Sequence, residues 1–272
     1  MISFPNCKIN LGLYIVEKRV DGFHNLETIF YPIPICDALE SVRDQGAKLP
    51  QLHLSGLPVP GDVTENLCLK AWHILRADFP QLPAVQMHLH KLIPMGAGLG
   101  GGSSDGAAAL ALLNGQFNLG LTIEQLAAYA LRLGSDCPFF ILNRPAFATG
   151  RGEQLSIVDL DLSVFDIVVI YPGVHISTAL AFSGITPTPA INHLPDIIRQ
   201  PVSTWKDNMH NVFEPVAIGA YPQLAAIKIW LYENGALYAS MTGTGAAFYG
   251  IFPKHTVLPA VPDANWQVLQ SR

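Results

Sequence analysis

Charged residues are scarce in this sequence. Asp, Glu, Lys and Arg make up 14% of the 272 residues, against about 25% in an ordinary globular protein. Only 16 residues are Lys or Arg, and the formal net charge is −5. No basic stripe is present, so we expect no nucleic-acid partner. Half of the residues are hydrophobic, which predicts a large buried core in one large or two modest domains.

Cysteines are few and long apolar runs are absent. The four cysteines, Cys7, Cys36, Cys68 and Cys137, form no C-x-x-C pair, so they indicate reduced thiols and not a zinc site or a disulfide framework. No apolar run reaches the roughly 18 residues that a membrane span needs. The sequence does not open with a basic segment followed by an apolar one. We therefore expect a cytoplasmic protein without a membrane partner.

Glycine, in contrast, is crowded into one stretch between Pro94 and Asp105. Glycine adopts positive φ at little cost, so successive backbone N–H groups can turn toward an anion. Ser103 or Ser104 can then N-cap a helix that runs through Leu113, whose amino end adds free donors. The residues predicted to form this phosphate cradle are Pro94, Gly96, Gly98, Gly100, Gly101, Gly102, Ser103 and Ser104.

Three other interpretations of the glycine stretch are weaker. Gly96, Gly98 and Gly101 satisfy the dinucleotide pattern G-x-G-x-x-G, but the preceding strand alternates polar and apolar residues, whereas a Rossmann strand is buried on both faces. No Gly-Lys-Ser or Gly-Lys-Thr closes a Walker A loop. A flexible linker would not open with proline after a strand and end in a helix cap.

The segments before the glycine stretch alternate between strand and helix signals. Residues 7–15 alternate polar and apolar, which predicts a half-buried strand with Lys8 and Asn10 on the face away from the core. Asp21-Gly22 predicts a turn and a returning strand over 23–31. Short strands and turns are expected over 37–62, a helix capped by Thr64 or Asn66 over 66–79, and a strand from Val85 to Leu89.

After the glycine stretch, Thr122 and Gln125 predict a capping box and Gly134 a helix end. Asp136 is expected on a constrained turn before an apolar strand over 139–142. A change of domain near residues 150–165 divides the chain into 1–155 and 156–272. The later elements are expected to be a strand over 166–171, a short helix over 177–182, a proline-rich loop over 186–201, helices over 205–219 and 222–234, and strands over 236–241 and 246–252. Such interleaving favours an α+β fold.

The stretch from Pro94 to Asp105 resembles the phosphate-binding motif of the galactokinase, homoserine, mevalonate and phosphomevalonate (GHMP) kinase superfamily. Within it, Cys7-Lys8-Ile9-Asn10-Leu11, Asp21 to Thr28, Ser135 to Phe140 and Met241 to Ala246 resemble, in the same order, motifs of the 4-diphosphocytidyl-2-C-methyl-D-erythritol kinases. The resemblance covers the chain from residue 6 to about 250. It departs from the usual pattern at Gly106, Phe23 and Cys137, where alanine, tyrosine and an aliphatic residue are common, and no departure removes a reacting group.

The resemblance implies a two-domain α+β fold with mixed and antiparallel sheets, a deep cleft between an ATP-binding domain and a substrate-side domain, and transfer of the ATP γ-phosphate to the 2-hydroxyl of a cytidine-diphosphate-linked methylerythritol in non-mevalonate isoprenoid synthesis. A tertiary alcohol needs a carboxylate to take its proton and a cation to offset charge on the transferring group. Asp136 and Lys8 would fill these roles, and a neighbouring ammonium would keep Asp136 ionised. Read singly, Asp136 is better explained as a turn cap and Lys8 as a solvated lysine, whereas the two together in these motifs favour catalysis.

For the two nucleosides, the resemblance places adenine near Asn66, Leu67 and Lys91 and the ATP phosphates along Gly96 to Ser104. The acceptor site would use Asn10, Phe23, His24, Thr178 and Phe182, with aromatic rings stacking on the flat cytosine. Ordinary packing explains Phe182 equally well on sequence alone. Mg²⁺ would arrive with ATP and touch Ser104 or Asp105, between which the sequence does not choose, so no metal ligand is assigned.

Other candidates stay open at this point. His88 and His90 share a strand face without an acid partner, which is more typical of a polar surface than of a metal site. A sister kinase acting on homoserine or mevalonate is the second functional hypothesis, and the segment Asp21 to Thr28 argues against it. A non-catalytic ligand-binding member of the fold is the third, and the presence of both Lys8 and Asp136 argues against that. The sequence leaves the oligomeric state open, with a homodimer as one candidate.

Overall fold

The computed structural model describes residues 1–190 and 193–270. These divide into two compact units that interleave along the chain. Unit 1 comprises Met1–Cys7, Ile35–Met95 and Gly100–Arg144, and unit 2 comprises Lys8–Pro34, Gly96–Leu99 and Pro145–Arg272. The expected domain boundary at residue 155 and the expected cleft remain predictions. Units defined by their internal packing need not share boundaries with domains defined by function.

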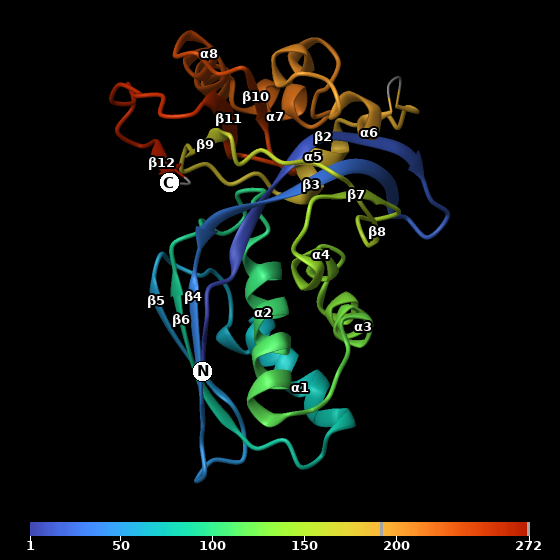
Figure 1. Cartoon of the computed structure of the whole chain (residues 1–272), viewed down its shortest axis with the longest axis vertical. Coiled ribbons are helices and arrows are strands. Elements are labelled where there is room, and N and C mark those ends of the chain that lie inside the picture. Colours follow the sequence, from blue (N-terminus) through green and yellow to red (C-terminus); the bar gives the residue numbers. More distant parts are fainter. Residues whose placement is uncertain (191–192, 271–272) are drawn as a thin grey trace. The chain divides into compact units, whose positions relative to one another are not determined.

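Unit 1 contains one mixed sheet in the order β1-β4-β6-β5. Figure 1 shows its helices on one side of the β4, β6 and β5 strands. The β5–β6 pair is parallel and the other pairs are antiparallel. The elements are β1 (Ile2–Ser3), β4 (Ala38–Arg43), β5 (Gln51–Gly56), η1 (Val63–Glu65), α1 (Leu67–Asp78), β6 (Val85–Lys91), α2 (Gly101–Phe117), α3 (Ile123–Leu133) and α4 (Cys137–Leu142).

Local signals placed most of these elements correctly. Of the two candidate caps for α1, the side chain of Asn66 accepts the N–H of Cys68. The capping box of Thr122 and Gln125 opens α3, and Gly134 closes it. Leu75, Leu89, Leu110 and other buried side chains of α1, β6 and α2 form one hydrophobic core. The α1 and α2 helices pack so closely that a Cβ on Gly106 would lie 2.8 Å from the Cβ of Leu67. Glycine in place of the usual alanine suits this contact.

Two predictions in unit 1 are wrong. The α2 helix begins at Gly101, so Ser103 and Ser104 lie inside its first turn and do not cap it. Gly100, with φ of +72°, starts the helix earlier because a residue without Cβ adopts this conformation freely. Residues 139–142 belong to α4 and not to a strand. A short apolar run fits both states, and Pro138 in the first turn favours a helix start.

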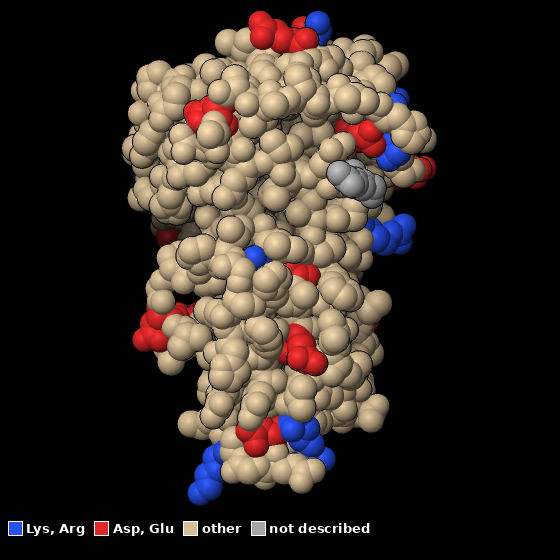
Figure 2. All heavy atoms as spheres, turned by 90° about the vertical axis from the view of Figure 1, so that its left-hand side faces the viewer, with Lys and Arg blue, Asp and Glu red and all other residues tan. Residues whose placement is uncertain are grey.

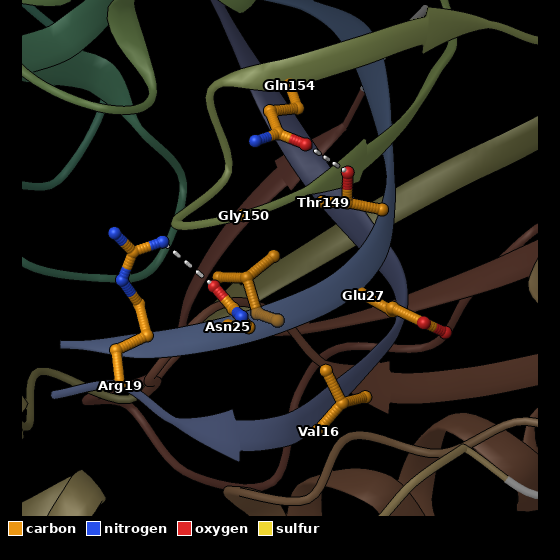
Figure 3. Close-up of a pocket in the computed structure, with 8 residues that line it drawn as sticks. Val16, Arg19, Asn25, Glu27, Thr149, Gly150 and Gln154 are labelled. Carbon is orange, nitrogen blue, oxygen red and sulfur yellow. Dashed lines mark hydrogen bonds between the residues drawn. The ribbon is translucent and has the colours of Figure 1, made fainter.

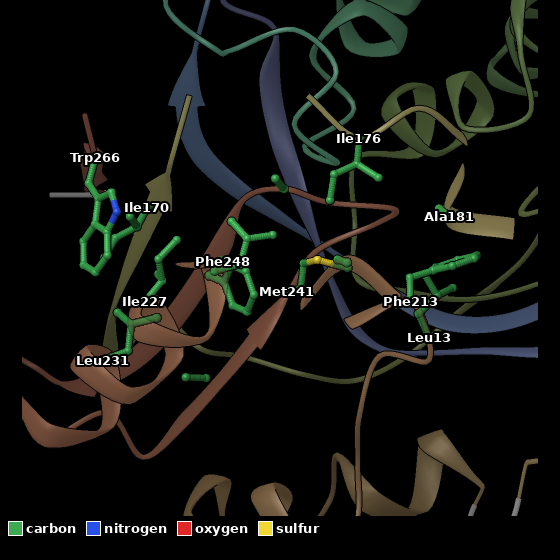
Figure 4. Close-up of a cluster of buried hydrophobic side chains, with 14 of the residues drawn as sticks. Leu13, Ile170, Ile176, Ala181, Phe213, Ile227, Leu231, Met241, Phe248 and Trp266 are labelled. Atoms are coloured by element: carbon green, nitrogen blue, oxygen red, sulfur yellow. The ribbon is translucent and has the colours of Figure 1, made fainter. Parts of the chain in front are cut away.

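Unit 2 contains two sheets, in the orders β2-β3-β7-β8 and β10-β11-β9-β12. The second sheet is antiparallel throughout. Its core joins Phe248 and Ile170 of the strands to Ile227 and Leu231 of α8 and to Phe213 (Figure 4). The strands are β2 (Asn6–Lys18), β3 (His24–Cys36), β7 (Ala146–Thr149), β8 (Gln154–Ile157), β9 (Phe165–Tyr171), β10 (Tyr238–Met241), β11 (Phe248–Pro253) and β12 (Gln267–Gln270).

The helices of unit 2 partly follow the expectations. Ser177 caps α5 (Thr178–Ser183), as the sequence predicts. The expected loop over 186–201 contains α6 (Leu194–Ile197), while residues 191 and 192 lie outside the described residues. The expected helix over 205–219 is wrong, since η2 (Val202–Asp207) and α7 (Glu214–Ala220) flank a segment that pairs with Leu13 of β2. The other helices are η3 (Pro222–Leu224) and α8 (Ala225–Glu233).

The β2 strand is not half-buried, which corrects the expectation from alternation. Every residue from Cys7 to Ile15 is buried, including Lys8 at 3% exposure and Asn10 at 2%. A Cβ on Gly12 would lie 2.6 Å from Leu194 and 2.8 Å from Met209, so α6 and the residues after η2 close over the strand there. The polar residues of β2 therefore face protein and not open solvent.

Candidate active site

The second half of the glycine stretch lies in unit 1 and forms the start of α2. No side chain caps this helix end, and Gly102 and Ser103 in its first turn are half-buried. The first N–H groups of a helix have no partner within the helix, and they carry a positive partial charge. An uncapped helix start behind a glycine loop therefore fits a phosphate group.

The first half of the stretch lies in unit 2, where packing itself requires glycine. Gly96 and Gly98 have φ of +66° and +80°. A Cβ on Gly98 would lie 2.1 Å from the carbonyl oxygen of Thr242, and one on Gly96 would lie 2.6 Å from Nδ1 of His175. The N–H of Ala247 also donates to the carbonyl of Ala97 at 3.1 Å. The loop is thus held by a second glycine turn more than 140 residues away.

Lys8 lies against this loop. Its Nζ donates to Oδ1 of Asn10 at 2.6 Å and to the carbonyl of Gly98 at 3.1 Å. The ammonium also lies 4.9 Å from the centroid of the Phe30 ring. Asn10 uses its own side chain within the protein, since Oδ1 also accepts the N–H of Gly243 and Nδ2 donates to Thr28. The predicted pair Lys8 and Asn10 is therefore brought together next to the glycine loop.

The Thr242–Gly243 turn is fixed from behind by residues that the sequence reasoning did not select. The Nδ2 of Asn211 donates to the carbonyls of Met241 and Gly243, each at 2.8 Å. Glu214 accepts the N–H of Met241 at 3.1 Å. The hydroxyl of Thr242 in turn bonds Asn10 and the Gly98 carbonyl. In the sequence, the polar residues Asn211 and Glu214 on either side of two apolar residues were the available signal. Which backbone groups they bond could be known only from the fold.

Asp136 lies in unit 1, at the N-cap position of α4, and is half-buried. Its side chain does not cap that helix. The adjacent Cys137 is fully buried, and burial raises the pKa of its thiol to about 12. Cys137 is therefore not a reactive thiol.

The three residues expected near adenine are all in unit 1. Asn66 and Leu67 are half-buried at the start of α1, where Asn66 acts as the cap. The side chain of Lys91 is fully buried and forms ion pairs with Asp37 and Asp105. Only the main chain of Lys91 is left for a contact with adenine. Asp105, one of the two alternative magnesium contacts, is paired with Lys91 through Oδ2.

The expected acceptor residues all lie in unit 2, and two of them are in contact. The rings of His24 and Phe182 have centroids 4.9 Å apart, and Phe182 also packs edge-on against Phe213. Phe23 is exposed, and the guanidinium of Arg151 lies 4.9 Å from its ring centroid. Thr178 is exposed in the first turn of α5. The sequence did not single out Arg151, because the glycines on either side of it do not indicate that it contacts Phe23.

A shallow polar cavity of about 270 Å³ lies on the β2–β3–β7–β8 sheet near these residues. Figure 3 shows Arg19 donating to Asn25 and Thr149 bonded to Gln154 along its wall. The carbonyl of Gly150 accepts the N–H of Leu26 at 2.7 Å. The polar groups that line the cavity are largely hydrogen-bonded to one another, and these bonds support the hairpin that carries Phe23 and His24.

Neither the charged residues on the surface nor the histidines considered as metal ligands add a binding group to the site. On the face drawn in Figure 2, charged side chains of the described residues are scattered singly or in small groups among uncharged atoms. His88 and His90 both bond Oγ of Ser55 at 2.8 Å. Over residues 1–190 and 193–270, no group of three or more His, Cys, Asp or Glu side chains could hold a metal ion. No helix in that part of the chain is long and apolar enough to cross a membrane.

Family models match segments of both units. The GHMP kinases N terminal domain matches residues 66–144, which include α1, α2 and Asp136. The GHMP kinases C terminal domain matches residues 194–265, which include Asn211 and the Thr242–Gly245 turn. The protein is therefore a kinase of the GHMP class, and its two-domain α+β fold with mixed and antiparallel sheets is as expected. Members of this class use ATP.

Individual relatives narrow the family. The 4-diphosphocytidyl-2-C-methyl-D-erythritol kinase of Bacteroides fragilis is 51% identical over 93% of this chain and 92% of its own. A crystal structure of 4-(cytidine 5'-diphospho)-2C-methyl-D-erythritol kinase has a TM-score of 0.79 and 32% identity, covering 92% of this chain and 90% of that one. Mevalonate kinase from Methanococcus jannaschii, with a TM-score of 0.69, 12% identity and coverage of 99% and 97%, shares the fold alone. The chain belongs to the 4-diphosphocytidyl-2-C-methyl-D-erythritol kinase family.

Proposed function

We propose that the protein transfers the γ-phosphate of ATP to the 2-hydroxyl of 4-diphosphocytidyl-2-C-methyl-D-erythritol, a step of non-mevalonate isoprenoid precursor synthesis. The observation that carries the phosphoryl-transfer chemistry is the uncapped start of α2 directly behind the glycine loop. The names of the relatives at 51% and 32% identity support the choice of acceptor. All the residue roles below are part of this proposal.

Asp136 acts as the general base. Its carboxylate accepts the proton of the acceptor hydroxyl as that oxygen forms a bond to the γ-phosphorus, and the bond from phosphorus to the β–γ bridging oxygen breaks to release ADP. Lys8 supplies positive charge beside the transferring group. The contacts of Lys8 with Asn10 and Gly98 support this role, because they hold the ammonium at the glycine loop.

The ATP phosphates bind along Gly96, Gly98 and Gly100 to Ser104, with Pro94 before them. Adenine lies near Asn66, Leu67 and the main chain of Lys91. Mg²⁺ bound with ATP offsets negative charge on the phosphates. No protein ligand is assigned to it.

The cytidine end of the acceptor binds to the cluster of Phe23, His24 and Phe182, with Thr178 at its edge. The ring contact between His24 and Phe182, at 4.9 Å, supports a stacking surface. Arg151 holds the Phe23 ring by a cation–π contact, which supports one face of Phe23 being left for a base. Asn10 acts on the acceptor mainly through Lys8, because its side chain is engaged by the protein.

Substrate choice is tested by measuring ADP release with the cytidyl substrate, homoserine, mevalonate and galactose in parallel. We expect release with the cytidyl substrate alone. Release with homoserine or mevalonate and none with the cytidyl compound would make the protein a sister kinase. Binding of the cytidyl compound without ADP release from any mixture would indicate a non-catalytic member of the fold.

The role of Asp136 is tested by Asp136→Asn, which keeps the shape and removes the base. We expect turnover to fall by at least about 100-fold while the dissociation constant for ATP, measured by calorimetry, is unchanged. Asp78→Asn, at an exposed carboxylate of unit 1, is the matched control and should retain turnover. Near-normal turnover of Asp136→Asn would remove Asp136 as the base.

Two further parts of the proposal concern the whole protein. We propose that it acts in the cytoplasm and as a homodimer. Size-exclusion chromatography with light scattering checks the second point, and a mass of one chain, 29.5 kDa, would contradict it.

A further inference from the structure

Three charged side chains are buried together where β6 leads into the glycine stretch. Asp37, Lys91 and Asp105 are exposed by 1%, 0% and 2%. They come from the β3–β4 connection, the end of β6 and the second turn of α2, all within unit 1. None of their side chains is given a role in the reaction proposed above. Burying three charges is costly unless their geometry is needed or very well satisfied.

Asp37 fixes the direction in which the chain enters the loop. Its Oδ1 accepts the N–H groups of Leu92 and Ile93, at 2.6 and 2.9 Å. These are the last backbone donors before Pro94, which has none. Its Oδ2 forms an ion pair with Lys91. One carboxylate therefore holds both the backbone of the strand exit and the buried ammonium.

Lys91 carries this restraint to the phosphate-binding turn. Its Nζ donates to Oδ2 of Asp105 at 2.7 Å. A Cβ on Gly101, the first residue of α2, would lie 3.3 Å from the same Nζ and 2.9 Å from Ile93. The ammonium thus lies directly beneath the helix start. Because the dipole disfavours a cation at that end, the two carboxylates are needed to hold it there.

The triad is not an optimised stabilising network. Oδ1 of Asp105 is buried and has no hydrogen-bond partner among the described residues. With both carboxyl groups ionised, the triad also carries one excess negative charge. Apolar residues of similar volume are often as stabilising as buried ion pairs. Its value therefore lies in where it places the backbone.

We infer that Asp37, Lys91 and Asp105 are positioning residues that set the geometry of the phosphate-binding turn, and that the Lys91 side chain serves the ATP phosphates through this turn and not through adenine. The inference rests on the proposed function, in which that turn holds the ATP phosphates. If the Lys91 side chain positions the turn, removing its ammonium weakens the binding of ATP but not of adenosine. If it serves adenine, the binding of both ligands is weakened.

The test compares ATP with adenosine as ligands of the full chain by calorimetry. Lys91→Met keeps the unbranched side chain up to its fourth heavy atom and removes the ammonium. We expect the dissociation constant of ATP to rise about tenfold or more, while that of adenosine stays within about twofold. Arg132→Met, at an exposed ion pair with Asp78 in the same unit, is the matched control and should leave both constants unchanged.

Lys91→Met leaves two buried carboxylates facing each other, so it can fail to fold. The triple variant Asp37→Asn, Lys91→Met, Asp105→Leu buries no charge and removes the same restraint, and thermal melting checks its fold. The same loss for ATP with adenosine binding retained supports the inference. Equal losses for ATP and adenosine, or unchanged ATP affinity in a folded variant, would overturn it. A wild-type protein that binds neither ligand would instead refute the proposed function.

Discussion

At the scale of single residues, burial decides what each charged group can do. Lys8 and Lys91 are both almost fully buried. The contacts of Lys8 include an amide oxygen and a carbonyl oxygen, and those of Lys91 include two carboxylates. Burial lowers the pKa of Lys91, but Asp105 and Asp37 outweigh it and the pKa is raised. Lys91 therefore stays charged and cannot act as a base.

Asp105 should make the stability of the protein depend on pH. Burial raises its pKa to about 7 from 3.8, with Lys91 opposing and Asp37 reinforcing the shift. Cys68 and Cys36, whose own thiol pKa values are raised by burial, are titratable groups near the triad. Because the folded state binds the proton more tightly than the unfolded state, the free energy of unfolding should fall as pH rises from about 4 to about 7.

Urea denaturation of the wild type and Asp105→Asn at pH 5 and pH 7.5 measures this effect. The wild type should lose more stability between the two values than the variant, by a difference on the order of 2 kcal/mol. Lys91 and Asp37 remain in the variant, so their contribution to both curves is shared. Equal losses of stability between pH 5 and pH 7.5 in the two proteins would contradict the assignment of this pH dependence to Asp105.

At the scale of elements, the two glycine turns depend on each other. Gly98 lies against the carbonyl of Thr242, and its own carbonyl accepts both Lys8 and the Thr242 hydroxyl. Asn211 and Glu214 hold the Thr242 turn from the other side. A segment far along the chain therefore sets the position of the lysine at the loop.

Gly98→Ala should be strongly damaging. The φ of +80° and the 2.1 Å approach to Thr242 leave no room for a Cβ, so we expect a loss of more than about 2 kcal/mol of stability and most of the activity. Gly219→Ala in α7 is the matched control. Nothing lies within 4 Å of a Cβ there, and alanine favours a helix by about 0.5–1 kcal/mol. Thermal melting and ADP release distinguish the two, and equal effects would contradict the account.

At the scale of the whole molecule, the burial of the four cysteines shows how far the protein interior excludes solvent. Cys7, Cys68 and Cys137 are fully buried, and Cys36 is half-buried. Burial raises the pKa of Cys36 as well, with Asp37 adding to the shift. Thiolates are the reactive species, so all four should react slowly at neutral pH.

Labelling with a thiol reagent checks this distribution. The native protein should lose at most one thiol, that of Cys36, over the time in which the denatured protein loses all four. A Cys36→Ser variant should then label negligibly before unfolding. Rapid labelling of two or more thiols in the native state would show that a buried cluster opens.

Short-range signals predicted the elements whose ends are set locally. The Asn66 cap and the capping box of Thr122 and Gln125 are satisfied within three residues, so the sequence was sufficient for α1 and α3. The start of α2 and the state of residues 139–142 were wrong, because an αL glycine and a short apolar run are each compatible with more than one structure.

By itself, the sequence determined the family, and it supplied the proposals for the phosphate loop and the reacting residues, because each is written as a contiguous motif. Only the tertiary structure decided what surrounds them. The partners of Lys91 are 54 and 14 residues away, and the atoms that hold Gly98 belong to residues 8 and 242. Hydrogen bonds and close packing act over a few ångströms regardless of separation along the chain, so no local pattern could reveal that β2 is buried on both faces or that Lys91 is enclosed by two carboxylates.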